Sequence, residues 1–157
     1  MKWRAVIGKR DLIFGSELAA ARFYEQQGKP VTIELDDRPS AEMRRFFEGA
    51  VVPYVFYQSG AAWSDFRECR EALKLEFLPS WARDLRGNRV KLARSTTELS
   101  KAGFQRFLED VLRWMELQGM EVPDAEEYKR WRDSGPLEGE TYPPLKRLIV
   151  LSKVLGK

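Results

Sequence analysis

The pattern of hydrophobic and polar positions changes along the chain, from the alternation typical of strands to the three- and four-residue spacing typical of helices. Alternating residues predict strands over residues 2–7 and 12–14, and a third strand over residues 31–35. Between them, Ser16 is a suitable N-cap for a helix that runs to about residue 27. The N-terminal part is therefore expected to have the order ββαβ.

Helical spacing dominates the middle of the chain. Ser40 precedes a helix that is expected to reach Tyr57, in which Pro53 should cause a kink or a break because it lacks an N–H group. A further helix is expected over residues 65–77, with Ser64 as its N-cap and Pro79 as its stop. After it, the sequence Arg86-Gly87-Asn88-Arg89 is typical of a turn and predicts the tip of a hairpin within residues 85–92.

The second half is expected to be mainly helical. Ser100 is a better N-cap than Ser95, Thr96 or Thr97 for a long amphipathic helix that Gly119 closes. Asp124 begins a short helix, and residues 134–157 form an appended segment, either helix or strand. We expect an α+β fold, with a small antiparallel sheet, several helices, and one domain over residues 1–133 followed by that segment.

Composition narrows the classes of function. The 157 residues include no histidine and one cysteine, which removes the commonest general base and leaves no pattern typical of a catalytic or metal site. We therefore expect a protein that is not an enzyme and needs no cofactor or metal. The start of the chain lacks a signal-peptide pattern, and no run approaches the ~20 apolar residues of a membrane span. These features predict a cytoplasmic protein without a membrane contact.

Charge is unevenly distributed along the sequence. Residues 83–106 contain seven basic and two acidic side chains, whereas residues 109–140 contain four basic and ten acidic side chains. The first segment suits a phosphate backbone and the second suits a basic partner, although solvated surface explains both equally well.

The basic segment is the leading candidate for a nucleic-acid interface. Trp81, Tyr57, Trp63 and Phe66 are candidates for stacking on unpaired bases, with core packing as the alternative. The hydroxyl groups of residues 95–97 could donate to phosphates or merely connect two elements. The candidate nucleic-acid contacts are Arg44, Arg45, Arg83, Arg86, Arg89, Lys91 and Arg94.

A second interpretation places a metal-dependent nuclease at a strand end. Glu34, Asp36 and Asp37 lie where magnesium-dependent nucleases often hold carboxylates, and a polar turn is the alternative. A third interpretation is a protein-interaction module that uses the acidic residues 109–140 and does not bind DNA.

Three blocks of sequence resemble phage and prophage recombination proteins of the NinB type, the family of Orf-like recombination mediators. They are residues 38–53, with the helix that Pro53 interrupts, residues 73–78, and residues 94–124, with the Ser-Thr-Thr segment, the amphipathic helix and the Pro-Asp end. The resemblance covers residues 1–133. Many relatives carry Gln-Asn and a Trp in the first block, where this sequence has Met43-Arg44 and Glu48, so the fold carries over better than the site.

The resemblance implies a non-catalytic recombination mediator. Its expected partners are single-stranded DNA, the host single-strand-binding protein and a second copy of the chain in a homodimer. If the protein is phage-encoded, it is expected in the host cytoplasm.

Overall fold

The computed structural model describes residues 5–7, 12–14, 25 and 38–155. The chain divides into two units, residues 1–36 and residues 37–157. In the first unit, β1 (Ala5–Ile7) pairs antiparallel with β2 (Leu12–Phe14), with Val6 opposite Ile13. This pairing confirms the first two predicted strands. The helix and the third strand expected over residues 16–35 lie outside the described residues.

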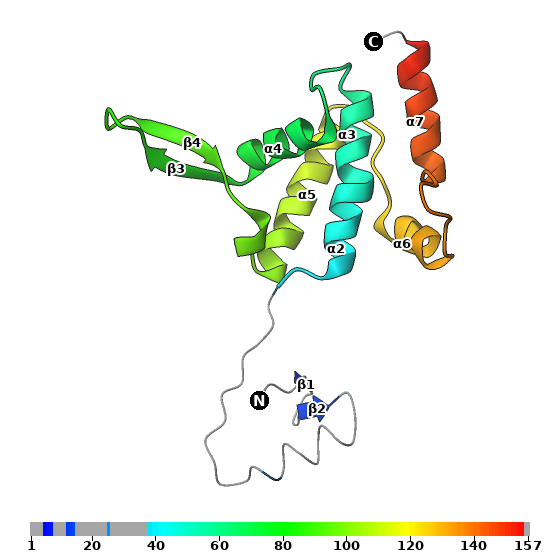
Figure 1. The fold of residues 1–157 in the computed structure, drawn as a ribbon, viewed down its shortest axis with the longest axis horizontal. Helices are drawn as coiled ribbons and strands as arrows, with labels where there is room; N and C mark the ends of the chain where they lie inside the picture. Colours follow the sequence, from blue (N-terminus) through cyan, green and yellow to red (C-terminus); the bar gives the residue numbers. More distant parts are fainter. Residues whose placement is uncertain (1–4, 8–11, 15–24, 26–37, 156–157) are drawn as a thin grey trace. The chain divides into compact units, whose positions relative to one another are not determined.

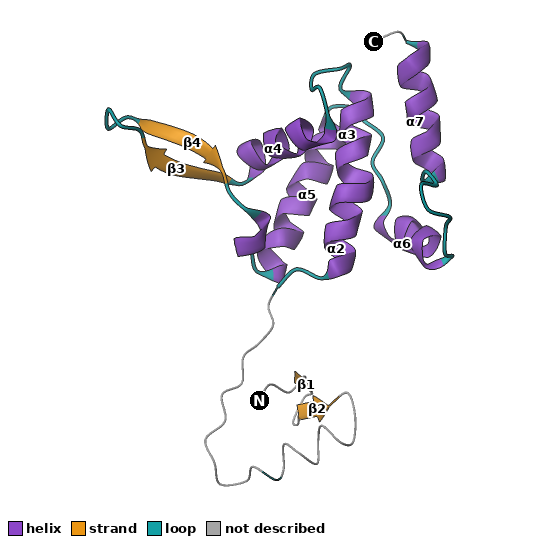
Figure 2. Ribbon diagram, viewed as in Figure 1, coloured by secondary structure: helices purple, strands orange, loops and turns teal. Residues whose placement is uncertain are grey.

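The second unit is a helical body with one hairpin (Figures 1 and 2). Its helices are α2 (Ala41–Phe46), α3 (Val52–Gln58), α4 (Phe66–Phe77), α5 (Lys101–Leu117), α6 (Ala125–Asp133) and α7 (Pro143–Val154). The hairpin is formed by β3 (Pro79–Arg83) and β4 (Arg89–Ala93). The structure confirms an α+β layout with a helical C-terminal half, and the appended segment contains a helix. The domain division at residue 133 stays a prediction.

The helix that contains Pro53 is continuous, so the expected kink or break at Pro53 is wrong. Between α2 and α3, residues Phe47–Val51 form the π-helical segment η1, in which the Val52 N–H donates to the carbonyl of Phe47, five residues earlier. Pro53 cannot donate to the carbonyl of Gly49 and its ring crowds that carbonyl. The wider π turn accommodates the proline without ending the helix, which runs to Gln58.

Local capping explains where the later helices begin. The Asp65 carboxylate accepts from the N–H of Glu68 at 2.7 Å and begins α4, one residue later than Ser64, the N-cap that the sequence suggested. Ser100 Oγ accepts from the N–H of Gly103 at 3.0 Å, and Asp124 caps α6 in the same way at 2.7 Å. These two caps confirm the sequence predictions.

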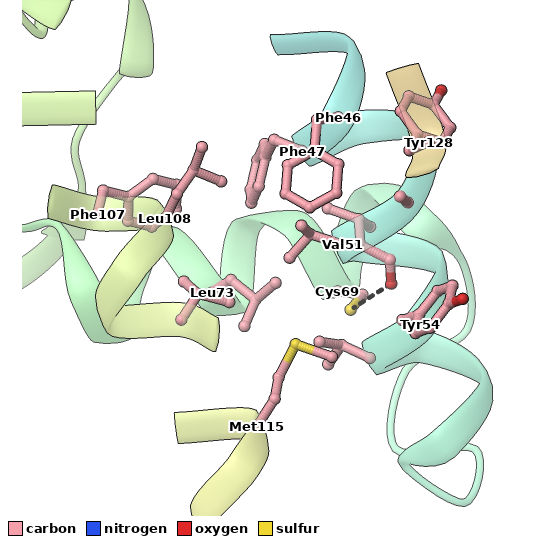
Figure 3. Close-up of a cluster of buried hydrophobic side chains, with 14 of the residues drawn as sticks. Phe46, Phe47, Val51, Tyr54, Cys69, Leu73, Phe107, Leu108, Met115 and Tyr128 are labelled. Atoms are coloured by element: carbon pink, nitrogen blue, oxygen red, sulfur yellow. Dashed lines mark hydrogen bonds between the residues drawn. The ribbon is translucent and has the colours of Figure 1, made fainter. Parts of the chain in front are cut away.

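The continuous helix α2–η1–α3 lies between α4 and α5 on one side and α6 and α7 on the other (Figure 1). On the first side, the ring of Phe47 packs 6.0 Å from Phe104 and 5.1 Å from Phe107. On the other side, Phe46 packs 6.0 Å from Tyr128 of α6. Side chains from both sides therefore form one apolar core (Figure 3).

Cys69 belongs to this core. Its side chain is fully buried, and its Sγ lies 3.8 Å from the Val52 carbonyl oxygen, which it faces as a weak donor (Figure 3). Burial raises the pKa of the thiol to about 12. The thiol is therefore protonated near neutral pH and acts as a small packing group.

Candidate nucleic-acid interface

The β3–β4 hairpin, residues 79–93, projects from the helical body as an arm (Figure 1). Its strands are antiparallel, and the arm packs against α4 at its base. The structure confirms the predicted hairpin, but its strands cover residues 79–83 and 89–93 instead of lying within residues 85–92. Pro79 does not merely end the preceding helix, because it is also the first residue of β3, a position in which a strand tolerates proline. Arg89 belongs to β4 rather than to the tip.

A network around Asp84 fixes the turn at the tip of the arm. The Asp84 carboxylate accepts from the N–H groups of Arg86 and Asn88, both at 2.8 Å, and from the Asn88 side-chain amide at 3.2 Å. Hydrogen bonds from Asn88 and Arg86 hold the pKa of Asp84 below its ordinary value. Gly87 adopts a positive φ of 82°, which suits the left-handed position of such a turn. The tip is thus defined by its own residues.

Strand register places aromatic and basic side chains on one face of the arm. Trp81 lies opposite Lys91, and Arg83 lies opposite Arg89. Directly opposed residues in an antiparallel pair share a face, as do residues two apart along a strand. These four residues therefore form one surface, which we call the basic face. The other face carries Ser80, Ala82, Val90 and Leu92 and has no charge.

Trp81 and Arg89 form the centre of the basic face. The Arg89 guanidinium lies over the indole of Trp81, with its central carbon 4.9 Å from the ring centroid. This separation is within the range of a cation–π contact. Trp81 nevertheless remains 56% exposed. The arm thus presents a large aromatic surface to solvent, and the guanidinium group of Arg89 is already held beside it.

Two of the expected contacts hold ion pairs with acidic neighbours. Lys91 Nζ lies 3.6 Å from a carboxylate oxygen of Glu76, and Arg94 Nε lies 3.5 Å from one of Glu98. Both pairs are partly exposed, so they contribute little to stability and can exchange for a phosphate. Within the part of the chain that the structure describes, three arginines of the arm make no ion pair: Arg83, Arg86 and Arg89.

Arg44 and Arg45 lie elsewhere in the helical body. They belong to α2, which packs against η1 and α6, whereas the arm packs against α4. Arg45 is exposed, and Nε of Arg44 is buried without a hydrogen-bond partner among residues 38–155. The structure therefore separates the two α2 arginines from the arm.

Two of the other aromatic candidates pack together away from the arm, and the third, Trp63, lies beside α4 and the base of β4. Tyr57 and Phe66 make edge contacts with each other at 5.7 Å and with Phe56 at 5.2 Å and 4.9 Å. Trp63 is partly buried against the core. Core packing thus describes Tyr57 and Trp63, while Phe66 is 43% exposed.

The hydroxyl segment before α5 is a capped turn. Thr96–Glu98 form a 3₁₀ turn, and Ser95 Oγ accepts from the N–H of Thr97 at 3.3 Å. The hydroxyl groups of Ser95 and Thr97 also lie 2.7 Å apart and form a hydrogen bond. These contacts fix the local structure of the connection between the arm and α5, and donation from the hydroxyl groups to phosphates stays a prediction.

Part of the acidic segment is neutralised within the chain. Glu121 forms an ion pair with Arg147 of α7. Lys129, a cation of the same segment, lies 3.6 Å from Glu42 of α2 and does not offset a carboxylate of the segment. Burial, and then the carboxylates of Glu127 and Glu121, raise the pKa of Tyr54 to about 12. Tyr54 therefore keeps its proton and acts as a packing residue.

Sequence reasoning missed the residue at the tip of the arm. Leu85 is fully exposed between Asp84 and Arg86. An exposed leucine has no sequence signature of its own, because its exposure follows from the turn that Asp84 and Gly87 set.

The carboxylates proposed for a metal site, Glu34, Asp36 and Asp37, lie outside the described residues. Among the residues that are described, no group of three or more His, Cys, Asp or Glu side chains lies close enough to hold a metal ion. Likewise, no helix in the described ranges has both the length and the apolar character needed to cross a membrane.

A comparison with solved structures finds a similar protein. It is described as NinB, from structural genomics. It is 19% identical to this chain, the alignment covers 76% of this chain and 98% of that one, and the TM-score is 0.40. No family model and no curated protein matches the chain. A likeness at this TM-score carries no argument about function.

Proposed function

We propose that this protein is a phage-type accessory protein of DNA recombination that binds single-stranded DNA without cutting it. The observation that carries the proposal is the basic face of the arm, where Arg89 lies 4.9 Å over the ring of the exposed Trp81. The assignment to recombination rests on the sequence resemblance of residues 1–133 to Orf-like mediators.

The arm supplies the two interactions that single-stranded nucleic acid requires. The free face of Trp81 stacks on an unpaired base, an interaction worth about 1–3 kcal/mol per base. Arg83 and Arg86 contact the flanking phosphates, together with Lys91 once the phosphate displaces Glu76. A base inside a duplex is already stacked and cannot reach Trp81, so the face favours the single strand.

The remaining contacts belong to the same proposal. Arg44 and Arg45 on α2 hold a more distant part of a bound strand, and Arg94 contributes at the base of the arm. The resemblance supports a homodimer and a contact with the host single-strand-binding protein, in the host cytoplasm. No cofactor takes part, because binding and release of DNA involve no covalent step.

The test is fluorescence anisotropy of labelled single-stranded and duplex oligonucleotides over a series of salt concentrations. Each phosphate contact to a single strand contributes about −0.7 to the slope of log affinity against log salt. The three phosphate contacts of the arm, from Arg83, Arg86 and Lys91, therefore predict a slope of about −2 or steeper. Arg86→Ala should reduce the slope by about 0.7, because it removes one such contact.

Two variants separate stacking from charge. Trp81→Ala should weaken binding by roughly tenfold or more and leave the salt slope unchanged, since it removes a base contact worth about 1–3 kcal/mol. Arg113→Ala, which removes an exposed charge from α5, is the matched control and should bind like the wild type. Equal binding of wild type and Trp81→Ala, or no binding at low salt, would contradict the proposal and direct attention to protein partners of the acidic segment.

A further inference from the structure

The outer side of α7 carries an apolar stripe that nothing in the helical body covers. Leu145 and Leu148 are buried against the body, whereas Val150, Leu151 and Val154 are 57%, 46% and 75% exposed. Val154 lies four positions after Val150 and three after Leu151, so the three residues share the side opposite the core. A stripe of this kind typically marks a contact surface.

Charge accompanies the stripe. Lys146 and Lys153, seven residues apart, are exposed along one border of the stripe. Among residues 38–155, neither lysine makes an ion pair, and α7 itself contains no acidic residue. The stripe therefore suits a surface that is both apolar and acidic, and two copies of it would repel each other.

Such a surface exists at the base of the arm. A shallow, open groove of about 410 Å³ runs between α4 and β4, with Leu75 and Leu92 as its exposed apolar residues, 38% and 48% exposed. Glu68 and Glu71 of α4 also line the groove. Glu71 is held by Lys74 at 2.8 Å and by Arg70 at 3.4 Å, so Glu68 is the carboxylate of this lining that makes no ion pair within residues 38–155. Lys91 is the one cation in its lining, and this lysine is paired with Glu76.

We infer that the outer side of α7 of one copy binds the α4–β4 groove of a second copy. Val150, Leu151 and Val154 would cover Leu75 and Leu92. The lysines on the border of the stripe, Lys146 and Lys153, would meet the carboxylate of Glu68. The groove and α7 lie at opposite ends of the helical body (Figure 1). The contact is therefore head-to-tail, and it extends from copy to copy unless the rotation closes a ring.

The test compares molar masses by light scattering over a range of protein concentrations, without DNA. The stripe variant carries Leu151→Asp and Val154→Asp, and the groove variant carries Leu75→Lys and Leu92→Lys. All four positions are exposed, so folding is expected to persist and is checked by circular dichroism. A quadruple variant carries all four substitutions and cannot form the contact. We call its molar mass the base mass, whether it corresponds to one chain or to a symmetric pair.

The expected result is specific to a head-to-tail contact. Wild type should exceed the base mass increasingly with concentration, and each double variant alone should stay at the base mass. An equimolar mixture of the two double variants should form a heavier species, because one supplies an intact groove and the other an intact stripe. Leu117→Asp with Leu137→Asp, at exposed positions outside both surfaces, should behave like wild type.

Three outcomes would overturn the inference. Wild type at the base mass at every concentration would show that the two surfaces do not meet. A groove variant that still assembles would indicate pairing of two α7 stripes. A mixture that stays at the base mass would exclude the contact between stripe and groove. Because the assay contains no DNA, its result is independent of the proposed DNA binding.

Discussion

Gly49 allows a close approach between two helices and gives the most direct test of the packing. It lies in η1, against Tyr128 of α6. A Cβ atom at position 49 would lie 2.0 Å from the Tyr128 hydroxyl oxygen and 3.0 Å from the ring carbon that bears it. Real Cβ atoms essentially never approach another atom closer than 3.0 Å, so Gly49→Ala requires the tyrosine hydroxyl to move by at least about 1 Å.

The tyrosine has little room for that movement. Its side chain is 5% exposed, and its ring packs against Phe46, Trp131 and Tyr142 at 6.0, 5.7 and 5.3 Å. Overpacking of a well-packed core typically costs about 1–3 kcal/mol. Alanine has a better helix propensity than glycine, which offsets about 1 kcal/mol of this cost. Because the overlap at 2.0 Å is severe, the cost should lie at the upper end of that range, and we expect Gly49→Ala to lower the free energy of unfolding by about 2 kcal/mol.

The assay is urea unfolding followed by circular dichroism, with a double-mutant cycle. Tyr128→Phe removes the oxygen at 2.0 Å but leaves the ring carbon at 3.0 Å, so it should restore part of the loss caused by Gly49→Ala. Gly103→Ala in α5 is the matched control, since its nearest neighbour is the Ser100 hydroxyl at 3.2 Å and a small shift suffices. If Gly49→Ala were as stable as wild type, or if Tyr128→Phe gave no relief, the described packing would be wrong.

Three further predictions concern single residues. Because burial raises the pKa of Cys69 to about 12, its thiol should resist alkylation near neutral pH and react only after denaturant is added. Hydrogen bonds in the arm lower the pKa of Asp84, so its contribution to the turn is complete above the unfolded value of about 3.9 and is lost as pH falls through the lower folded value. A carboxyl titration by NMR with a midpoint at or above that unfolded value would contradict this geometry. Ser100→Ala should lower the free energy of unfolding by about 1 kcal/mol through loss of the α5 cap, measured by urea unfolding.

The sequence predicts best those features that depend on neighbouring residues. The caps at Ser100 and Asp124 are confirmed because a cap needs only a side-chain oxygen and an N–H group three residues later. The outcome at Pro53 needed more information, since a π turn replaces the expected kink and depends on the surrounding packing. Pro79 is likewise compatible with a helix end and with a strand start, and it serves as both.

The candidate site also combines features that the sequence predicts with features that depend on the folded structure. The basic segment and its hairpin are visible in the sequence, but the pairing of Trp81 with Arg89 depends on strand register. The separation of Arg44 from the arm is a property of tertiary structure, because it follows from the packing of α2 against α6. Whether seven cations act together therefore could not be determined from their spacing.

Side chains along each strand of the arm alternate between the basic face and the uncharged face. The number of residues between Trp81 and the turn therefore decides which face the indole occupies. Inserting one residue into β3 between Trp81 and Arg83 would turn the indole to the uncharged face and separate it from Arg89, while the composition of the arm would be almost unchanged. Inserting two residues into each strand at the base of the arm would lengthen the arm and keep the indole and guanidinium together. Natural or engineered variants of this arm should therefore tolerate changes in length by even steps, and lose the stacked pair at odd ones.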